Sequence, residues 1–136
     1  MRVFLGGTCN GSTWREDLIP LLHVDSFNPV VEDWTPECQE EEIRQRQECD
    51  AVLYVLTPKI TGMYAIAEVV DDSNKRPEKV VFCVLYEDED QRFTPVQIKS
   101  LAAVVTMVSN NGACVCDNLR DVSRVLNAWG VQNAYC

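Results

Sequence analysis

One glutamate of the sequence has surroundings that suggest a chemical role. Glu68 lies near the second turn of a predicted short helix, and most of its neighbours from Met63 to Val70 are apolar. Its carboxylate either faces solvent, as most surface glutamates do, or points into a cleft, where it can act as a nucleophile or as an acid and base. Tyr64 lies four residues earlier, on the same face of the helix. We therefore treat Glu68 and Tyr64 as candidate catalytic residues.

A loop rich in glycine follows the first apolar run of the chain. Its seven residues are Gly6, Gly7, Thr8, Cys9, Asn10, Gly11 and Ser12. Glycines let backbone N–H groups approach a ligand closely, and the start of the helix that follows favours an anion. The loop is therefore a candidate cradle for a sugar or a phosphate, with Gly6, Gly7, Thr8 and Asn10 as candidate substrate-binding residues. It matches neither the dinucleotide-binding nor the Walker pattern, so a turn without a ligand is the alternative.

The segment from Pro36 to Glu48 predicts a helix that is polar nearly all round. It holds five glutamates and two arginines, and Ile43 is its main apolar residue. A helix of this kind buries little by itself. For most of these charges we expect a solvated, salt-bridged face. Packing between subunits, or one carboxylate that reaches a site, are the alternatives.

The composition is that of a globular protein with one core. The chain has 136 residues, of which 46% are apolar and 24% charged, and this length suits one domain. Its 21 acidic and 12 basic residues give a formal net charge of -9, which disfavours binding to a nucleic-acid polymer. Its longest apolar runs have six or seven residues, against roughly 20 for a membrane span. Because no basic and apolar leader opens the chain, we expect a cytoplasmic protein without a membrane partner.

The cysteines indicate neither a metal centre nor a disulfide framework. There are seven of them, no C-x-x-C pair occurs, and His23 is the one histidine. Cys114 and Cys116 flank an apolar residue, which suits a strand better than a metal site. We expect a reduced protein that uses cysteine as a small apolar residue, with no metal ligands and no cofactor.

Apolar runs and helical stripes alternate five times along the chain. Strands are predicted at residues 2–5, 27–31, 51–56, 79–86 and 113–116. Helices are predicted at residues 13–22, 36–48, 63–72, 94–108 and 117–129. Capping-box spacing at Thr13 and Thr94, and Thr35 before a proline, mark three helix starts. Gly112 and Gly130 mark two helix ends.

This alternation predicts an α/β fold. We expect one three-layer flavodoxin-like domain over residues 1–136, with a five-stranded parallel sheet in the order 2-1-3-4-5 and helices on both faces. In that topology a ligand binds at the carboxyl ends of strands 1 and 3, where the strand order reverses. The loops at this point cover residues 6–12 and 57–62. Gly62 and Met63, at the end of the second loop, are therefore further candidate substrate-binding residues.

Several segments of the sequence resemble the nucleoside 2-deoxyribosyltransferase superfamily, which also contains the 2'-deoxynucleoside 5'-phosphate N-hydrolases. They are FLGG at residues 4–7, CDAVLYV at residues 49–55 and the segment at residues 62–68. The segments most similar to its phage and bacterial deoxyribosyltransferase-like branch are GGTCNGSTWR at residues 6–15, FNPVV at residues 27–31 and IAEVVDDS at residues 66–73. The resemblance covers about residues 1–90 and implies a deoxyribosyltransferase-like domain.

The resemblance also implies roles for two carboxylates. The family's nucleophile is a glutamate on the helix after the third strand, and this position corresponds to Glu68. A second acid lies in the preceding helix, eight residues before the aspartate that opens the third strand. Counting back from Asp50 gives Glu42. Glu42 is then the candidate for protonating the departing base or for orienting the substrate.

Two positions differ from the family pattern. Many relatives have a tyrosine near the end of the first strand that hydrogen-bonds the nucleophile, whereas this chain has Phe4. Tyr64 is an alternative source of a hydroxyl. Many relatives also have an aspartate six residues before the nucleophile, where this chain has Gly62. The set that anchors the sugar is therefore incomplete.

The implied activity is cleavage of the N-glycosidic bond of a nucleoside or nucleotide, a small-molecule substrate. Attack by a second base makes the reaction a transfer, and attack by water makes it a hydrolysis. Trp34 is a candidate for stacking on the base and Asp33 for reading its edge, with core or interface packing as the alternative for Trp34. The family is usually oligomeric, which implies a homo-oligomer, and the chemistry needs neither a metal nor a cofactor.

Two other functions stay open. A TIR-like NAD glycohydrolase also combines a flavodoxin-like sheet with a glutamate after a central strand, and residues 14–18 are faintly similar to that class. The other alternative is a non-catalytic nucleotide-binding or sensing module, which Phe4 and Gly62 favour.

Overall fold

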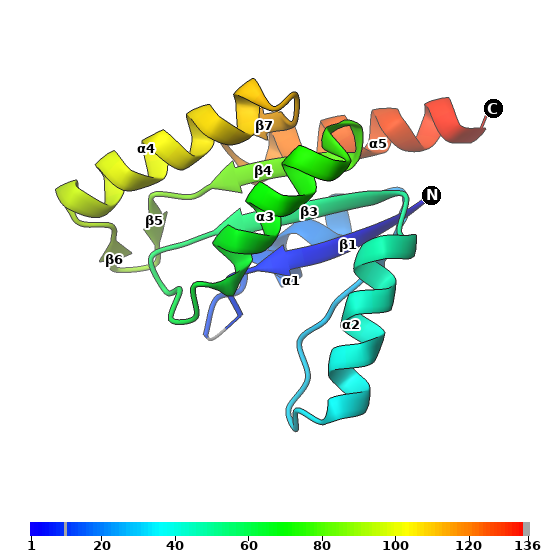
Figure 1. The fold of residues 1–136 in the computed structure, drawn as a ribbon, viewed down its shortest axis with the longest axis horizontal. Helices are drawn as coiled ribbons and strands as arrows, with labels where there is room; N and C mark the ends of the chain where they lie inside the picture. The colour runs from blue at the N-terminus through cyan, green and yellow to red at the C-terminus, as the bar shows by residue number, and fades with distance from the viewer. Residues whose placement is uncertain (10, 135–136) are drawn as a thin grey trace.

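Strands and helices alternate along the chain, as the sequence predicts (Figure 1). The computed structural model describes residues 1–9 and 11–134. Its strands are β1 (Arg2–Gly7), β2 (Asp25–Phe27), β3 (Ala51–Leu56), β4 (Val80–Val84), β5 (Glu87–Asp88), β6 (Gln91–Arg92) and β7 (Cys114–Cys116). Its helices are α1 (Trp14–Leu18), α2 (Pro36–Glu48), α3 (Tyr64–Lys75), α4 (Pro95–Asn110) and α5 (Leu119–Ala134). Within the described residues, no helix has the length and apolarity needed to cross a membrane.

Five strands form one parallel sheet in the order β2-β1-β3-β4-β7, which confirms the predicted flavodoxin-like topology. β1 lies between β2 and β3, with Phe4 opposite Phe27 on one side and opposite Val52 on the other. The chain order reverses here, so the carboxyl ends of β1 and β3 border a crevice. β5 and β6 form a separate short hairpin that the sequence did not predict.

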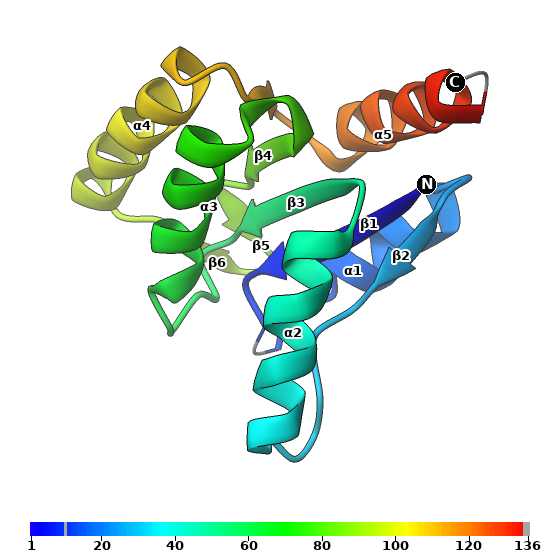
Figure 2. The same cartoon turned by 45° about the vertical axis from the view of Figure 1, so that its right-hand side comes forward.

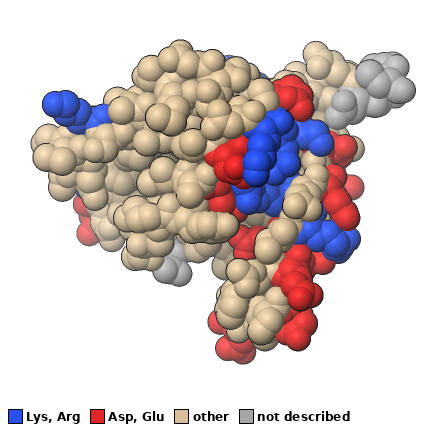
Figure 3. Space-filling model, viewed as in Figure 1, with Lys and Arg blue, Asp and Glu red and all other residues tan. Residues whose placement is uncertain are grey.

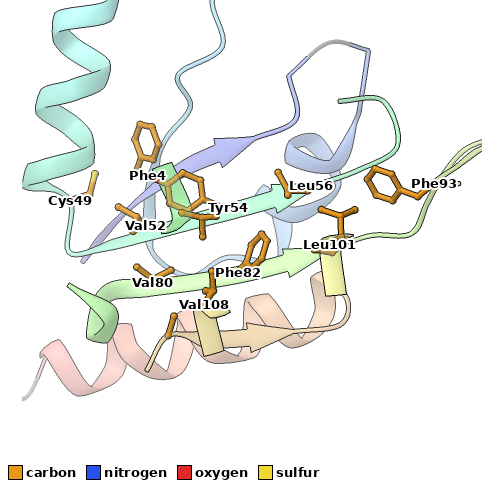
Figure 4. Packing of buried hydrophobic residues seen from close by; sticks show 13 residues of the cluster. Phe4, Cys49, Val52, Tyr54, Leu56, Val80, Phe82, Phe93, Leu101 and Val108 are labelled. Carbon is orange, nitrogen blue, oxygen red and sulfur yellow. The ribbon is translucent and has the colours of Figure 1, made fainter. Parts of the chain in front are cut away.

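Both faces of the sheet are covered, and β3 is buried along its whole length. On one face Phe4, Tyr54 and Phe82 belong to one core (Figure 4). Val69 of α3 and Leu101 of α4 belong to the same core. On the other face Leu5 and Leu53 pack in a second core with residues of α1 and α5. A strand that is buried on both faces has no polar alternation, which explains the continuous apolar run of β3. α2 stands beside α3 and projects away from the sheet (Figure 2).

The second strand lies earlier in the chain than predicted. The sequence predicts residues 27–31, whereas β2 ends at Phe27. Pro29 has no N–H to donate to a neighbouring strand, and the side chain of Asn28 accepts the backbone N–H of Val30 at 3.1 Å. The chain therefore turns directly after Phe27 and leaves Val30 exposed. The predicted position of this strand was wrong.

The three predicted helix starts are confirmed, and at two of them the threonine side chain caps the helix. Thr94 forms a capping box with Gln97 at the start of α4. Thr35 accepts the backbone N–H of Cys38 at 3.2 Å at the start of α2. Thr13 occupies the N-cap position directly before α1, but the predicted capping box does not form there: its backbone angles are not extended, and its hydroxyl donates to Asp17.

The last helix continues past the glycine that was predicted to end it. α5 runs through Gly130 to Ala134. A Cβ at Gly130 would overlap a methyl group of Val24, so this glycine permits close packing of the helix. Gly112, in contrast, has the positive φ of 104° that is typical of a residue after a helix end, as predicted for α4.

Gly7, at the end of β1, is expected to tolerate no side chain. Its φ is +116°, and a Cβ there would overlap the backbone carbonyl oxygen of Val55 on the central strand. We expect Gly7→Ala to lower the free energy of unfolding by roughly 3 kcal/mol or more, as measured by urea denaturation. Gly11→Ala is the matched control, because Gly11 also has a positive φ but has no atom within 4 Å of its Cβ position. This variant should lose only about 1 kcal/mol. Equal losses in the two variants would contradict the prediction.

Candidate active site

A pocket of about 300 Å³ opens where the carboxyl ends of β1 and β3 meet. This is the place that the topology predicts for a ligand. The wall of the pocket is built from the end of β1, the loops that follow β1, β2 and β3, and the helices α1, α2 and α3. Seven of the residues selected from the sequence line it: Gly6, Gly7, Thr8, Glu42, Gly62, Tyr64 and Glu68.

Glu68 lines the pocket although its side chain is nearly buried. It lies in the second turn of α3 and is 7% exposed. Its Oε2 atom is 3.7 Å from Nε of Arg46 on α2. Burial raises the pKa of the Glu68 carboxyl to about 7; the charge of Arg46 opposes this rise, while Glu42 and Asp72 add to it. At neutral pH the carboxyl therefore populates both its ionised and its protonated form.

Glu42 faces the same pocket from the opposite helix. It is partly buried in α2 and lines the pocket together with Glu68. Burial raises the pKa of the Glu42 carboxyl, and the charges of Arg15 and Arg46 oppose that rise. A carboxyl with a raised pKa retains its proton closer to neutral pH and is a better proton donor there. The helix that the sequence predicts as a solvated face thus brings one carboxylate to the pocket.

The two loops at the mouth of the pocket are tied together. The hydroxyl of Thr8, after β1, accepts the backbone N–H of Thr57, after β3, at 2.9 Å. The guanidinium of Arg15 in α1 donates to the carbonyl oxygen of Leu5 at 2.9 and 3.1 Å, and to that of Thr8 at 2.7 Å. Gly6 is required because a Cβ there would lie 2.7 Å from the ring of Tyr54. The glycine-rich loop is therefore held in one position from several sides.

The remaining selected residues lie outside the pocket or at its edge. Tyr64 lines it but is 71% exposed, so it lies at the rim. Met63 lines a separate apolar hollow between α3 and α4. Asp33 and Trp34 are exposed in the segment before α2, which runs alongside that helix in Figures 1 and 2, and neither lines the pocket. Asn10 lies outside the described residues.

Comparison with known protein families gives one match. The family model of proteins described as nucleoside 2-deoxyribosyltransferase like matches residues 1–87, which is more than half of the chain. The chain belongs to this family. No curated protein matches it. The family resemblance predicted from the sequence is confirmed, and the matched segment contains every residue that lines the pocket. Membership supports glycosyl transfer on nucleosides as the general class of reaction.

The structure of this deoxyribosyltransferase-like protein accounts for its two unusual positions. Phe4 is fully buried and packs 6.3 Å from the ring of Tyr54, between ring centroids. The Tyr54 hydroxyl donates to Asp72 at 2.5 Å, so a tyrosine of β3 reaches the underside of α3 while Phe4 remains apolar. Gly62 has no atom within 4 Å of its Cβ position, which leaves open space where the family pattern has an aspartate.

Sequence reasoning did not select the residues that support the two carboxylates. These residues are Arg15, Arg46, Tyr54 and Asp72, which lie in predicted helices or strands or in the segments of the resemblance but were given no role in the site. The signal that would have found two of them is their spacing. Arg46 follows Glu42 by four residues, and Asp72 follows Glu68 by four residues, so each lies on the same helix face as a pocket carboxylate.

The described part of this deoxyribosyltransferase-like protein contains no group of three or more His, Cys, Asp or Glu side chains that could hold a metal ion. The described cysteines are all free thiols, namely Cys9, Cys38, Cys49, Cys83, Cys114 and Cys116. Cys136 lies outside the described residues. Of these thiols, that of Cys9 belongs to a residue of the pocket wall.

Glu68 is expected to make the stability of the deoxyribosyltransferase-like fold depend on pH. Below about pH 4.5 its carboxyl is protonated in both the folded and the unfolded chain, so its ionisation does not lower the free energy of unfolding. Between pH 4.5 and 7 the unfolded chain releases the proton while the folded protein retains it, so the free energy of unfolding falls as the pH rises. The full loss above pH 7 is about 3 kcal/mol.

The variant Glu68→Gln removes this titration. We expect it to match the wild type in urea denaturation at pH 4.5 and to be more stable by about 1–3 kcal/mol at pH 8. Glu40→Gln, which changes an exposed glutamate of α2, should show no such divergence. If Glu68→Gln and the wild type differ by the same amount at both pH values, the raised pKa of Glu68 is refuted.

Proposed function

We propose that this protein cleaves the N-glycosidic bond of 2-deoxynucleosides, with Glu68 as the nucleophile and Glu42 as the acid and base. The observation that carries the proposal is the position of Glu68. Its carboxylate is nearly buried, has a pKa raised to about 7, and lines the pocket at the switch point of the sheet. Family membership supports glycosyl transfer on nucleosides as the type of reaction.

In the first step an ionised oxygen of Glu68 bonds to C1' of the sugar while the bond from C1' to the base nitrogen breaks. The electron pair of that bond leaves with the base. Protonated Glu42 delivers its proton to the base, which therefore departs as a neutral molecule. The products are a free base and a glycosyl ester on Glu68, formed through a transition state with oxocarbenium character.

In the second step a nitrogen of an acceptor base, or the oxygen of water, attacks C1' from the side that the first base left. The ester bond breaks and its electron pair returns to Glu68. Glu42, now ionised, takes the proton that the acceptor loses, so both carboxyls return to their starting forms. Two displacements at C1' retain its configuration. The same two residues thus serve transfer and hydrolysis.

The charges of the pocket wall favour a substrate without a phosphate. The charged residues among the described pocket lining are Arg15, Glu42 and Glu68. The guanidinium of Arg15 already donates to the carbonyl oxygens of Leu5 and Thr8. A phosphate would therefore meet two carboxylates, and no cation among these residues is unengaged. We propose that nucleosides are better substrates than their 5'-monophosphates, and that Gly6, Gly7 and Thr8 contact the sugar.

The experiment is an assay of base release by chromatography. The protein is incubated with deoxynucleosides, with ribonucleosides, with deoxynucleoside 5'-monophosphates and with NAD, each with and without an acceptor base. Release from deoxynucleosides supports the proposal, and a requirement for the acceptor identifies a transferase. Release from NAD alone would support the TIR-like alternative. Binding of nucleosides without release of base would support the non-catalytic module that Phe4 and Gly62 favour.

A further inference from the structure

Four charged residues form a compact group between α2 and α3. Glu42 and Arg46 lie four residues apart on α2, and Glu68 and Asp72 lie four residues apart on α3. Each pair therefore occupies one helix face. The first member of each pair lines the pocket, and the second members bind each other behind it. Figure 3 shows Lys and Arg side chains gathered beside Asp and Glu where α2 adjoins the rest of the molecule.

Arg46 makes the contacts that join the two helices. Its Nε atom lies 2.9 Å from one carboxylate oxygen of Asp72, and its Nη2 atom lies 3.1 Å from the other. The same Nη2 atom donates to Asp71 at 3.0 Å and to the backbone carbonyl of Glu68 at 3.4 Å. Nε is also 3.7 Å from the carboxylate of Glu68. One guanidinium thus contacts three acidic residues of α3, namely Glu68, Asp71 and Asp72.

Asp72 is a fixed anchor for that guanidinium. Its side chain is completely buried and accepts the Tyr54 hydroxyl from β3 at 2.5 Å. It also forms an ion pair with Arg76. A buried carboxylate is stable only when such partners compensate its charge. The Tyr54 ring lies against Gly6, which lines the pocket. Asp72 is therefore linked through Tyr54 to the wall of the pocket.

α2 has little else to hold it in place. Among the described residues of this helix, Gln45 alone is buried. The ion pairs of Arg44 with Glu41 and Glu48 stay within the helix and are exposed, so they stabilise the helix weakly and do not attach it to α3. The position of Glu42 relative to Glu68 therefore depends mainly on the contacts of Arg46.

We infer that Arg46 is a positioning residue that, anchored on Asp72, holds Glu42 and Glu68 at one pocket and supplies the positive charge next to the nucleophile. This inference rests on the proposed function. Arg46 lies behind the carboxylates and acts through them, so it is not itself a catalytic residue. The charged and titratable groups that face Glu68 are Arg46 and Glu42 from α2, Asp72 from α3 and Tyr54 from β3.

Three variants test the inference. Arg46→Gln removes the charge and the two-pronged contact with Asp72. Arg46→Lys keeps the charge but has one nitrogen in place of three, and Arg44→Gln removes an exposed arginine of the same helix. Steady-state base release is measured from pH 5 to 9, and thermal unfolding shows which variants are folded.

We expect Arg46→Gln to lower kcat by about 10²-fold, because the two carboxylates lose their relative position, with KM changed much less. The acid limb of its kcat/KM profile should move up by about one pH unit, since the cation next to Glu68 is gone. Arg46→Lys should recover part of kcat and most of the pH profile. Arg44→Gln should behave as the wild type. If folded Arg46→Gln and Arg46→Lys both behave as Arg44→Gln does, the inference is overturned.

A second measurement separates this inference from the proposed function. The titration of the Glu68 carboxyl is followed by carbon NMR of protein labelled at glutamate, with Glu68→Gln identifying the resonance. A midpoint that rises by about one unit in Arg46→Gln, but not in Arg44→Gln, supports the inference. An unchanged midpoint overturns it. Absence of base release by the wild type refutes the proposed function, and the NMR result then decides the role of Arg46 alone.

Discussion

Replacing Glu68 with alanine is expected to abolish base release while the fold is retained. If Glu68 forms the bond to C1', its removal leaves no group to take the sugar, and we expect kcat to fall by about 10⁴-fold or more. The side chain lies at a pocket wall and its burial raises its pKa, so its loss relieves an unfavourable charge at neutral pH. Thermal unfolding of the variant should therefore match or exceed that of the wild type.

The measurement is release of base from the best deoxynucleoside, with thermal unfolding recorded on the same samples. Glu68→Gln is the conservative variant and should be equally inactive, because an amide cannot act as the nucleophile. Glu40→Gln is the control for a lost glutamate elsewhere on the surface. The nucleophile assignment is wrong if Glu68→Ala retains a rate close to that of the wild type.

A trapped intermediate provides a direct check of the same residue. The proposed ester links C1' of the sugar to the Glu68 carboxylate. In a rapid quench of the wild type with a deoxynucleoside and no acceptor, mass spectrometry should find the deoxyribosyl group on the peptide that contains Glu68. A modified peptide from another part of the chain would move the nucleophile there.

Replacing Glu42 with glutamine is expected to have the second largest effect. Loss of a general acid lowers a rate by about 10²–10⁴-fold, and we expect kcat to fall within that range. Glutamine keeps the size of the side chain, so the pocket should retain its affinity for the nucleoside. Thermal unfolding is expected to stay close to that of the wild type, because Glu42 is only partly buried.

The role of Glu42 is tested by changing the leaving base. A nucleoside whose base already carries a positive charge, such as an N7-methylated purine, needs no proton to depart. For this substrate the rates of Glu42→Gln and the wild type should nearly coincide. An equal loss on both kinds of substrate would indicate that Glu42 orients the sugar and does not donate a proton. An unchanged rate on both would show that Glu42 lines the pocket without a role in the reaction.

The sheet could be predicted from the sequence because its signals are local. The continuous apolar run of β3 and the caps at Thr35 and Thr94 depend on neighbouring residues, and the structure has them where the sequence predicts. The position of β2 could not be read from Val30 and Val31, whose strand propensity is overridden by Pro29. Strand propensity by itself does not take into account that Pro29 has no backbone N–H to donate to a neighbouring strand.

The pocket was predicted in part, because the order of the strands follows from these local signals. Strand order alone locates the loops that contain Gly6, Gly7 and Gly62, and these residues line the pocket. The contacts of Arg46 with Asp72, and of Tyr54 with Asp72, join residues 26 and 18 positions apart. The first pair forms only when α2 packs beside α3, and the second only when α3 packs on β3, so no local pattern reveals them. The helical spacings from Glu42 to Arg46 and from Glu68 to Asp72 were the hints that the sequence offered.

The sparse attachment of α2 has a consequence for how this protein can diversify. Its exposed face carries no core side chains, so substitutions there leave the free energy of unfolding nearly unchanged. Yet the helix forms one side of the pocket through Glu42. Natural or laboratory evolution can therefore reshape the entrance for a different ligand by altering the exposed face of this helix and the segment before it, while the sheet and α3 keep Glu68 at the pocket.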